Sequence, residues 1–325
     1  MLNKYIVLLV ILFSSTSPLT AQDMKHYFIK VNGKHDGMEK AYQYEYGSVS
    51  TDENFKVKLQ EEAYGGPEQF LDSIKVKYPV ADYDFNIYIH GMWANSGMHW
   101  RESASNLSKE VFSNIERPQV IVSFIWDAAI LYPKSVSLAR AKGKQISPII
   151  HQLLVDNKGA HSINILAHSM GNRVFEEAIK PLWDKENIKI SRYFSLAADL
   201  EDNIFNKNQP LENLSNICSD IYIYMHNNDR TLKVSKLIND NNRLGLEGIN
   251  MELLKNETYK LIDVTLITDN EGIAADIFNH RYYYTSTIVK QDLNAILREK
   301  PSPLKKTLTS DNHYVLDPSL LPAEK

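Results

Sequence analysis

The sequence is poor in cysteine and carries no large excess of charge of either sign. Its 325 residues include a single cysteine, Cys218, so no internal disulfide can form and the fold must be stable without covalent cross-links. The formal net charge is −4, which gives no electrostatic reason to expect a nucleic-acid partner. There is neither an H-E-x-x-H motif nor a set of Cys and His residues at metal-ligand spacing. We therefore expect no metal and no cofactor.

Long apolar runs are also missing, and the longest candidate lies at the N-terminus. Lys4 precedes an apolar stretch from Tyr5 to Phe13, and a segment of small residues ends at Ala21. This stretch is about half of the ~20 residues that span a bilayer, so we expect a signal peptide cleaved after Ala21 and no stable membrane span after its removal. No cysteine lies near the cleavage point, which excludes a lipid-modified cysteine there. The predicted location is periplasmic or extracellular.

Apolar segments recur regularly through the middle of the chain, and most are followed by a helical pattern. Continuous apolar strands that alternate with helices are typical of a parallel sheet covered on both faces. We therefore predict an α/β fold with a mostly parallel central sheet and helices on both sides. The predicted strands are FNIYI (85–89), QVIVSFI (119–125), SINILA (162–167), SRYFSLA (191–197), DIYIYM (220–225) and LIDVTLI (261–267).

The chain divides into four predicted regions, without internal repeats. Residues 1–21 are the signal peptide, and residues 22–80 form an N-terminal extension packed on the core. In that extension HYFIKVNG and FKVKLQEEAY read as strands, and a helix begins at Pro67. Residues 81–300 form the α/β domain. Residues 301–325, rich in proline and charge, are predicted to be an irregular tail.

Ser169 lies where the predicted strand SINILA gives way to the helix NRVFEEAIK. Ligands of parallel α/β sheets bind at the carboxyl ends of the strands, so this position is a candidate site. A serine on a sharp strand-to-helix turn needs small residues two positions before and after it, and Ala167 and Gly171 meet that requirement. The pattern predicts a nucleophile. The simpler interpretation is a serine that caps the helix.

A nucleophilic serine needs a base, and in this type of fold the chain order is serine, acid, histidine. Only His280 and His313 follow every plausible acid. His280 comes after the last predicted core strand, whereas His313 lies in the tail, so we favour His280. A surface or structural histidine is the alternative interpretation.

The acid is predicted to be Asp229, which follows the strand DIYIYM in the loop HNNDRTL. Asp199 and Asp202, after the preceding strand, are alternatives because the acid can follow either neighbouring strand. Asp229 could also serve only as a helix cap.

Two backbone N–H groups are expected to bind an oxyanion. One belongs to Met170, the residue after the serine, and the other to Met92, which follows His90-Gly91 at the end of the first core strand. Taken alone, His-Gly after a strand indicates only a turn.

Four aromatic residues lie in or near the loops around this predicted site and could line an apolar acyl pocket. Aromatic side chains more often fill the core, which is the alternative interpretation. The four residues are Trp93, Trp100, Trp126 and Tyr132.

With these segments placed, the chain resembles the α/β-hydrolases, and specifically the bacterial group of unknown function, DUF900. The likeness runs from about Phe85 to Leu297 and implies a triad of Ser169, Asp229 and His280. The sequence departs from the pattern in two places: the turn begins with Ala167 instead of the commoner glycine, and FIWD stands where a Trp-Pro pair is expected. The blocks that carry the likeness are IHGMW, SFIWDAAILYPK, AHSMGNRVF, SLAADLEDNIF, IYIYMHNNDRTL and NHRYYY.

The resulting expectation is an exported serine hydrolase of the carboxylesterase or lipase type, acting on a small-molecule or lipid-like acyl substrate (an ester, thioester or amide) through an acyl-enzyme. Two alternatives stay open: a binding or scaffold protein that keeps the fold without hydrolysis, and an acyltransferase that uses the same triad. The sequence does not indicate an oligomeric state.

Overall fold

The structure is a computed structural model of the chain. It describes residues 25–32, 43–51, 57–78, 82–92, 107–129, 131–185, 187–269, 278–302, 305–307 and 312–320. The predicted signal peptide, residues 1–21, lies outside the described residues.

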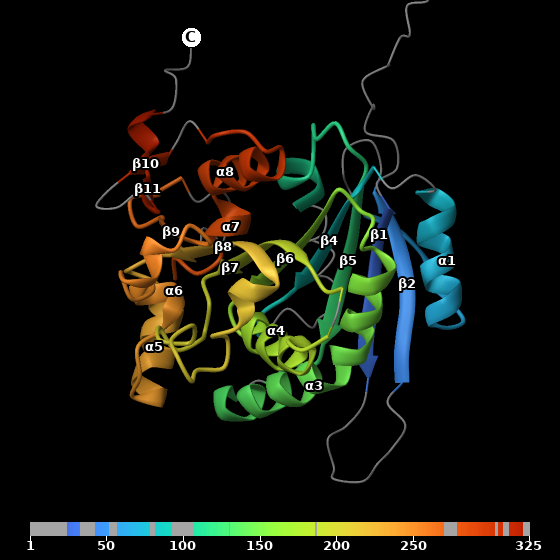
Figure 1. Cartoon of the computed structure of the whole chain (residues 1–325), viewed down its shortest axis with the longest axis horizontal. Coiled ribbons are helices and arrows are strands. Elements are labelled where there is room, and N and C mark those ends of the chain that lie inside the picture. The colour runs from blue at the N-terminus through green and yellow to red at the C-terminus, as the bar shows by residue number, and fades with distance from the viewer. Residues whose placement is uncertain are drawn as a thin grey trace, which may run out of the picture.

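One twisted sheet forms the centre of the described part of the chain (Figure 1). Its strand order is β10-β11-β9-β8-β7-β6-β4-β5-β1-β2-β3. From β11 to β1 all neighbouring strands are parallel, while β2, β3 and β10 are antiparallel additions at the two edges. The predicted α/β fold with a mostly parallel sheet is confirmed. The strands are β1 (Lys25–Asn32), β2 (Gln43–Thr51), β3 (Val57–Tyr64), β4 (Asp84–Ile89), β5 (Gln119–Trp126), β6 (Ser162–His168), β7 (Ile190–Leu196), β8 (Cys218–Met225), β9 (Tyr259–Asp263), β10 (Lys305–Thr307) and β11 (His313–Leu316).

Helices cover both faces of the sheet. Along β4 the side chains alternate, so that Ile87 and Ile89 join one apolar cluster and Tyr88 joins the other. The first cluster includes residues of α1, α3 and α4, and the second includes residues of α7 and α8. The helices are α1 (Pro67–Lys77), α3 (Tyr132–Asp156), α4 (Gly171–Ile179), α5 (Arg230–Asn239), α6 (Leu244–Glu247), α7 (Tyr282–Thr285) and α8 (Thr287–Leu297).

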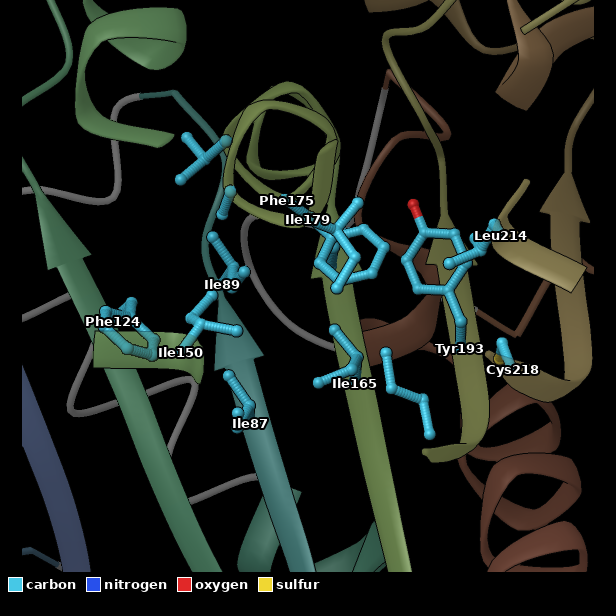
Figure 2. Packing of buried hydrophobic residues seen from close by; sticks show 14 of the residues in the cluster. Ile87, Ile89, Phe124, Ile150, Ile165, Phe175, Ile179, Tyr193, Leu214 and Cys218 are labelled. Carbon is cyan, nitrogen blue, oxygen red and sulfur yellow. The ribbon is translucent and has the colours of Figure 1, made fainter. Parts of the chain in front are cut away.

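Every residue of the central strands β4, β5 and β6 is buried, as a parallel sheet between two helical layers requires. Figure 2 shows Ile165 of β6 and Tyr193 of β7 on the same side of the sheet as Phe175 and Ile179 of α4. This packing fixes the end of β6 against the start of α4. The turn that carries Ser169 is therefore held between two rigid elements.

The two ends of the chain take a larger part in the sheet than the sequence suggested. β1 pairs in parallel with β5, so the N-terminal extension continues the sheet, with the predicted strands and the helix from Pro67 in place. The tail, predicted to be irregular, contains β10 and β11, and β11 pairs with β9 through buried Val315 and Leu316. Conversely, the strand predicted over 261–267 ends at Asp263 because a turn follows, in which the Asp263 side chain accepts the Thr265 N–H and the Val264 carbonyl oxygen accepts the Ile267 N–H.

Candidate active site

Ser169 occupies a strained turn between β6 and α4. Its φ angle is +52°, a region that non-glycine residues seldom adopt. The turn needs a glycine at position 171, because a Cβ there would lie 2.4 Å from the carbonyl oxygen of Ile89. Gly91 is equally constrained, since its Cβ would lie 2.8 Å from the Ser169 Cβ. The loop after β4 thus passes directly against the serine, and Ala167, just before the turn, is fully buried.

Asn172 braces this turn. Its side-chain amide donates hydrogen bonds to the carbonyl oxygens of Ala167 (3.0 Å) and Ser169 (2.9 Å), and its backbone N–H also donates to Ser169. The Tyr193 hydroxyl donates to the Asn172 side-chain oxygen at 2.6 Å. Sequence reasoning missed both residues, because neither periodicity nor spacing shows that two buried polar groups hold a turn.

The structure brings Ser169, His280 and Asp229 into one line of hydrogen bonds, although 111 and 51 residues separate the two pairs. His280 Nε2 lies 2.9 Å from Ser169 Oγ, and His280 Nδ1 lies 2.7 Å from Asp229 Oδ2. A carboxylate accepts hydrogen bonds, so Nδ1 carries the proton and, in a neutral ring, Nε2 accepts from the serine hydroxyl. This is the arrangement that removes a proton from a serine as it attacks.

Asp229 has two tasks, one for each oxygen. It is the N-cap of α5, where Oδ1 accepts the Leu232 N–H at 2.9 Å, and Oδ2 accepts from His280. The N-terminus of α5 also stabilises the buried carboxylate through its dipole. One carboxylate thus makes both the contact expected of a helix cap and the contact with His280.

The alternative acids are engaged elsewhere. Asp199 accepts hydrogen bonds from the hydroxyls of Tyr132 (2.7 Å) and Ser235 (2.5 Å), and it lies 3.7 Å from Arg243 Nε. The Asp199 backbone, and not its carboxylate, contacts the serine turn: the Asp199 N–H donates to the Ser169 carbonyl oxygen.

Asp202, the other alternative acid, accepts a hydrogen bond from the side chain of Asn242.

The alternative base, His313, is the first residue of β11 and pairs with Leu261, at the amino end of the parallel sheet. Ser169 follows the carboxyl end of β6, so His313 lies at the opposite edge of the sheet.

Two further histidines, His168 and His90, fix the backbone of segments near Ser169. His168 donates from Nε2 to the carbonyl oxygen of His280 at 3.1 Å, and its ring lies 4.6 Å from that of Tyr283. Burial first, and then the neighbouring His280, hold the pKa of His168 well below its usual value. His168 is thus a neutral donor that fixes the His280 backbone, a role that the sequence did not indicate.

His90 fixes the loop that precedes Met92. Burial lowers its pKa to about 4, so the ring is neutral, with Nδ1 donating to the Gly91 carbonyl oxygen and Nε2 accepting the Trp126 N–H. The Trp126 indole donates to the His90 carbonyl oxygen at 2.8 Å and stacks on the imidazole. Met92 follows Gly91 on this braced loop.

Two of the four aromatic residues expected to line a pocket are engaged in other contacts. Trp126 is fully buried and braces His90, so it offers no surface to a substrate. Tyr132 directs its hydroxyl to Asp199. Trp93 and Trp100 lie outside the described residues.

Among the described residues, no group of three or more His, Cys, Asp or Glu side chains could hold a metal ion. No helix in the same part of the chain is both long and apolar enough to cross a membrane. Cys218 is a buried free thiol, and burial raises its pKa.

Comparison with protein families matches residues 87–298 to the family described as alpha/beta hydrolase of unknown function, DUF900. Among solved structures, a thermostable esterase from Pseudomonas putida ECU1011 has 12% identity and a TM-score of 0.29 over 73% of this chain and 64% of its own, so the match spans less than two thirds of that esterase. An extracellular alpha/beta-hydrolase from a Paenibacillus species has 16% identity and a TM-score of 0.25 over 67% of this chain and 96% of its own. A comparison with curated proteins found no match. The family match runs from β4 to just beyond α8 and covers more than half of the 325 residues, and the chain belongs to this family of α/β hydrolases of unknown function.

Proposed function

We propose that the protein is an exported serine hydrolase that cleaves carboxylic esters through an acyl-enzyme on Ser169. The observation that carries the proposal is the hydrogen-bonded line from Ser169 Oγ through His280 to Asp229, at 2.9 and 2.7 Å. These distances are already those of a serine, a base and an orienting acid ready for proton transfer.

In the first half of the reaction, Ser169 Oγ attacks the ester carbonyl carbon while His280 Nε2 takes its proton. Asp229 keeps the imidazole in the required tautomer and stabilises its charged form. The N–H groups of Met170, at the start of α4, and of Met92 bind the negative oxygen of the tetrahedral intermediate. When that intermediate collapses, the C–O bond to the alcohol breaks and His280 gives the proton to the leaving oxygen.

In the second half, His280 removes a proton from water, and the resulting hydroxide attacks the acyl carbonyl carbon. The bond to Ser169 Oγ then breaks, Ser169 recovers its proton from His280, and the carboxylic acid leaves. An alcohol or amine in place of water would make the same site an acyltransferase. Product analysis with competing nucleophiles separates the two activities.

The proposal is tested by labelling with a fluorophosphonate and by hydrolysis of p-nitrophenyl esters of increasing chain length. We expect Ser169→Ala to abolish labelling and to lower kcat by about 10⁴-fold or more. A matched control is Ser123→Ala, since Ser123 is buried in β5 and its hydroxyl has no hydrogen-bond partner among the described residues.

Labelling that survives Ser169→Ala would remove Ser169 as the nucleophile. If the folded wild-type chain showed neither labelling nor hydrolysis, the fold would instead serve binding or scaffolding.

A further inference from the structure

Helix α5 turns an apolar face outward. In the described part of the chain, nine large apolar side chains are exposed, and four of these lie on α5 or at the start of α3. Tyr132, next to Leu131, reaches α5 through hydrogen bonds with Ser235 and Asn239, so the two segments adjoin. The four exposed residues are Leu131 (70% exposed), Val234 (56%), Leu237 (82%) and Ile238 (51%).

An ordinary surface helix buries its apolar face, whereas α5 exposes most of its apolar side chains. Only Leu232 and Ser235 of α5 are buried, and Ser235 uses its buried position to donate to Asp199. Val234, Leu237 and Ile238, three and four residues apart, therefore form one outward stripe. Exposing such a stripe to water is unfavourable, and contiguous exposed apolar patches mark surfaces that bind a partner or a lipid.

Positive charge surrounds this stripe. Helix α5 contains Arg230, Lys233 and Lys236 and no acidic residue, and Lys134 lies exposed one turn into α3. Lys236 pairs with Glu247 at 2.7 Å, and Asp240, the exposed C-cap of α5, is the acidic neighbour of the stripe. Arg230, Lys233 and Lys134 remain as cations that border it, so positive charge predominates. The whole chain has a net charge of −4, so the cluster is a local reversal of sign.

We propose that this face, the α5 surface (Leu131, Val234, Leu237 and Ile238 with Lys134, Arg230 and Lys233), docks onto an anionic lipid bilayer. Aliphatic side chains entering the interface together with cations that meet lipid phosphates are the mark of an interfacial membrane-binding helix. A second copy of the chain is a less suitable partner for this surface. A symmetric dimer through this face would bring two copies of the same cations together, whereas anionic headgroups neutralise them.

The α5 surface also adjoins the candidate active site. Asp229, the N-cap of α5, directly precedes Arg230, and the Arg230 N–H donates to the carbonyl oxygen of Phe278, two residues before His280. The Phe278 side chain is itself half exposed. A bilayer docked on α5 would therefore lie next to the segment that leads to His280, and the substrate class would be esters held in that bilayer; this consequence rests on the proposed function.

The experiment measures co-sedimentation of the purified chain with vesicles of phosphatidylcholine alone and of equal parts phosphatidylcholine and phosphatidylglycerol. We expect binding only to the phosphatidylglycerol vesicles, weakened by added salt because charge contributes to it. Val234→Ser with Leu237→Ser should lower the partition coefficient about tenfold or more, because two aliphatic side chains no longer enter the interface. Arg230→Gln with Lys233→Gln should lower it as well. Val76→Ser is the matched control and should change nothing, because it replaces a valine that is even more exposed than Val234 and lies between two lysines on α1, at the other side of the molecule (Figure 1).

Three results would overturn the proposal: no binding of the wild-type chain to either vesicle, binding that the Val234→Ser/Leu237→Ser variant retains, or a dimer in sedimentation that this variant dissolves. Ser169→Ala separates this proposal from the proposed function. It should bind vesicles like the wild type, so a failure of hydrolysis leaves the docking result intact and a failure of docking leaves hydrolysis of soluble esters intact.

Discussion

Replacing Asp229 by asparagine separates the two tasks of this residue. Asparagine caps a helix as well as aspartate does, so its side-chain oxygen can still accept the Leu232 N–H. The amide nitrogen that replaces Oδ2 is a donor, and it would face His280 Nδ1, which now donates at 2.7 Å. The imidazole must then take its other tautomer, with a proton on Nε2, and it can no longer accept from Ser169.

The expected loss is about 10⁴-fold in kcat, the size found when a triad aspartate becomes asparagine without other change. This corresponds to about 5.5 kcal/mol of transition-state stabilisation. The thermal midpoint should hardly move for Asp229→Asn. Asp229→Ala removes the cap as well, at a cost of about 1 kcal/mol, and should lower the midpoint by roughly 2–4 °C more.

The assay combines p-nitrophenyl ester kinetics with thermal melts of both variants and of Asp202→Asn. Asp202 accepts only from Asn242 among the described residues, so that control should keep both kcat and the midpoint close to wild type. If Asp229→Asn keeps its kcat, or if Asp199→Asn loses activity while Asp229→Asn does not, the assignment of the acid is wrong.

Three further predictions concern the turn, the braced loop and export. Gly171→Ala should destabilise the fold by about 2 kcal/mol or more, because the new Cβ meets the carbonyl oxygens of Ile89 and His90 at 2.4 and 2.6 Å; an unchanged thermal midpoint would contradict this contact. The pKa of His90 is about 4 in the fold and about 6.5 when unfolded, so the unfolded chain binds more protons in that window and stability is lost as the pH falls from 6.5 towards 4. Urea unfolding should give a free energy about 2 kcal/mol lower at pH 5 than at pH 7 from this group alone, and His90→Asn should reduce the dependence by that part, since buried His26 and His168 also contribute. A bacterial host that expresses the whole chain should release a protein whose first residue, identified by mass spectrometry, is Gln22, whereas recovery only of the uncleaved chain would contradict the signal peptide.

The turn that carries Ser169 could be predicted from local sequence because its constraints are local. A serine at positive φ between a strand and a helix needs small neighbours, and Ala167 and Gly171 lie within two residues of Ser169. The parallel sheet could be predicted for a similar reason, since continuous apolar segments separated by helical patterns have few other solutions. The order of serine, acid and histidine then limited the partners to a few residues.

The sequence favoured Asp229 and His280 among those partners, but it could not exclude the alternatives. Asp199, Asp202 and Asp229 all follow strands, and only the packing of β7, β8 and their loops directs Asp229 to His280 and Asp199 to Tyr132. The hydrogen bonds that fix the Ser169 turn also depend on packing, because nothing local shows that Asn172 of α4 meets Tyr193 of β7.

Sequence by itself determined the central strands β4 to β9, the turn at Ser169 and a short list of partners, because sterics and periodicity act over a few residues. Only the tertiary structure decided which carboxylate meets His280, that Trp126 is a buried brace for His90, and that α5 turns its aliphatic side chains outward. The first two outcomes depend on contacts between residues 51 and 36 positions apart, whose geometry is set by the packing of the whole sheet.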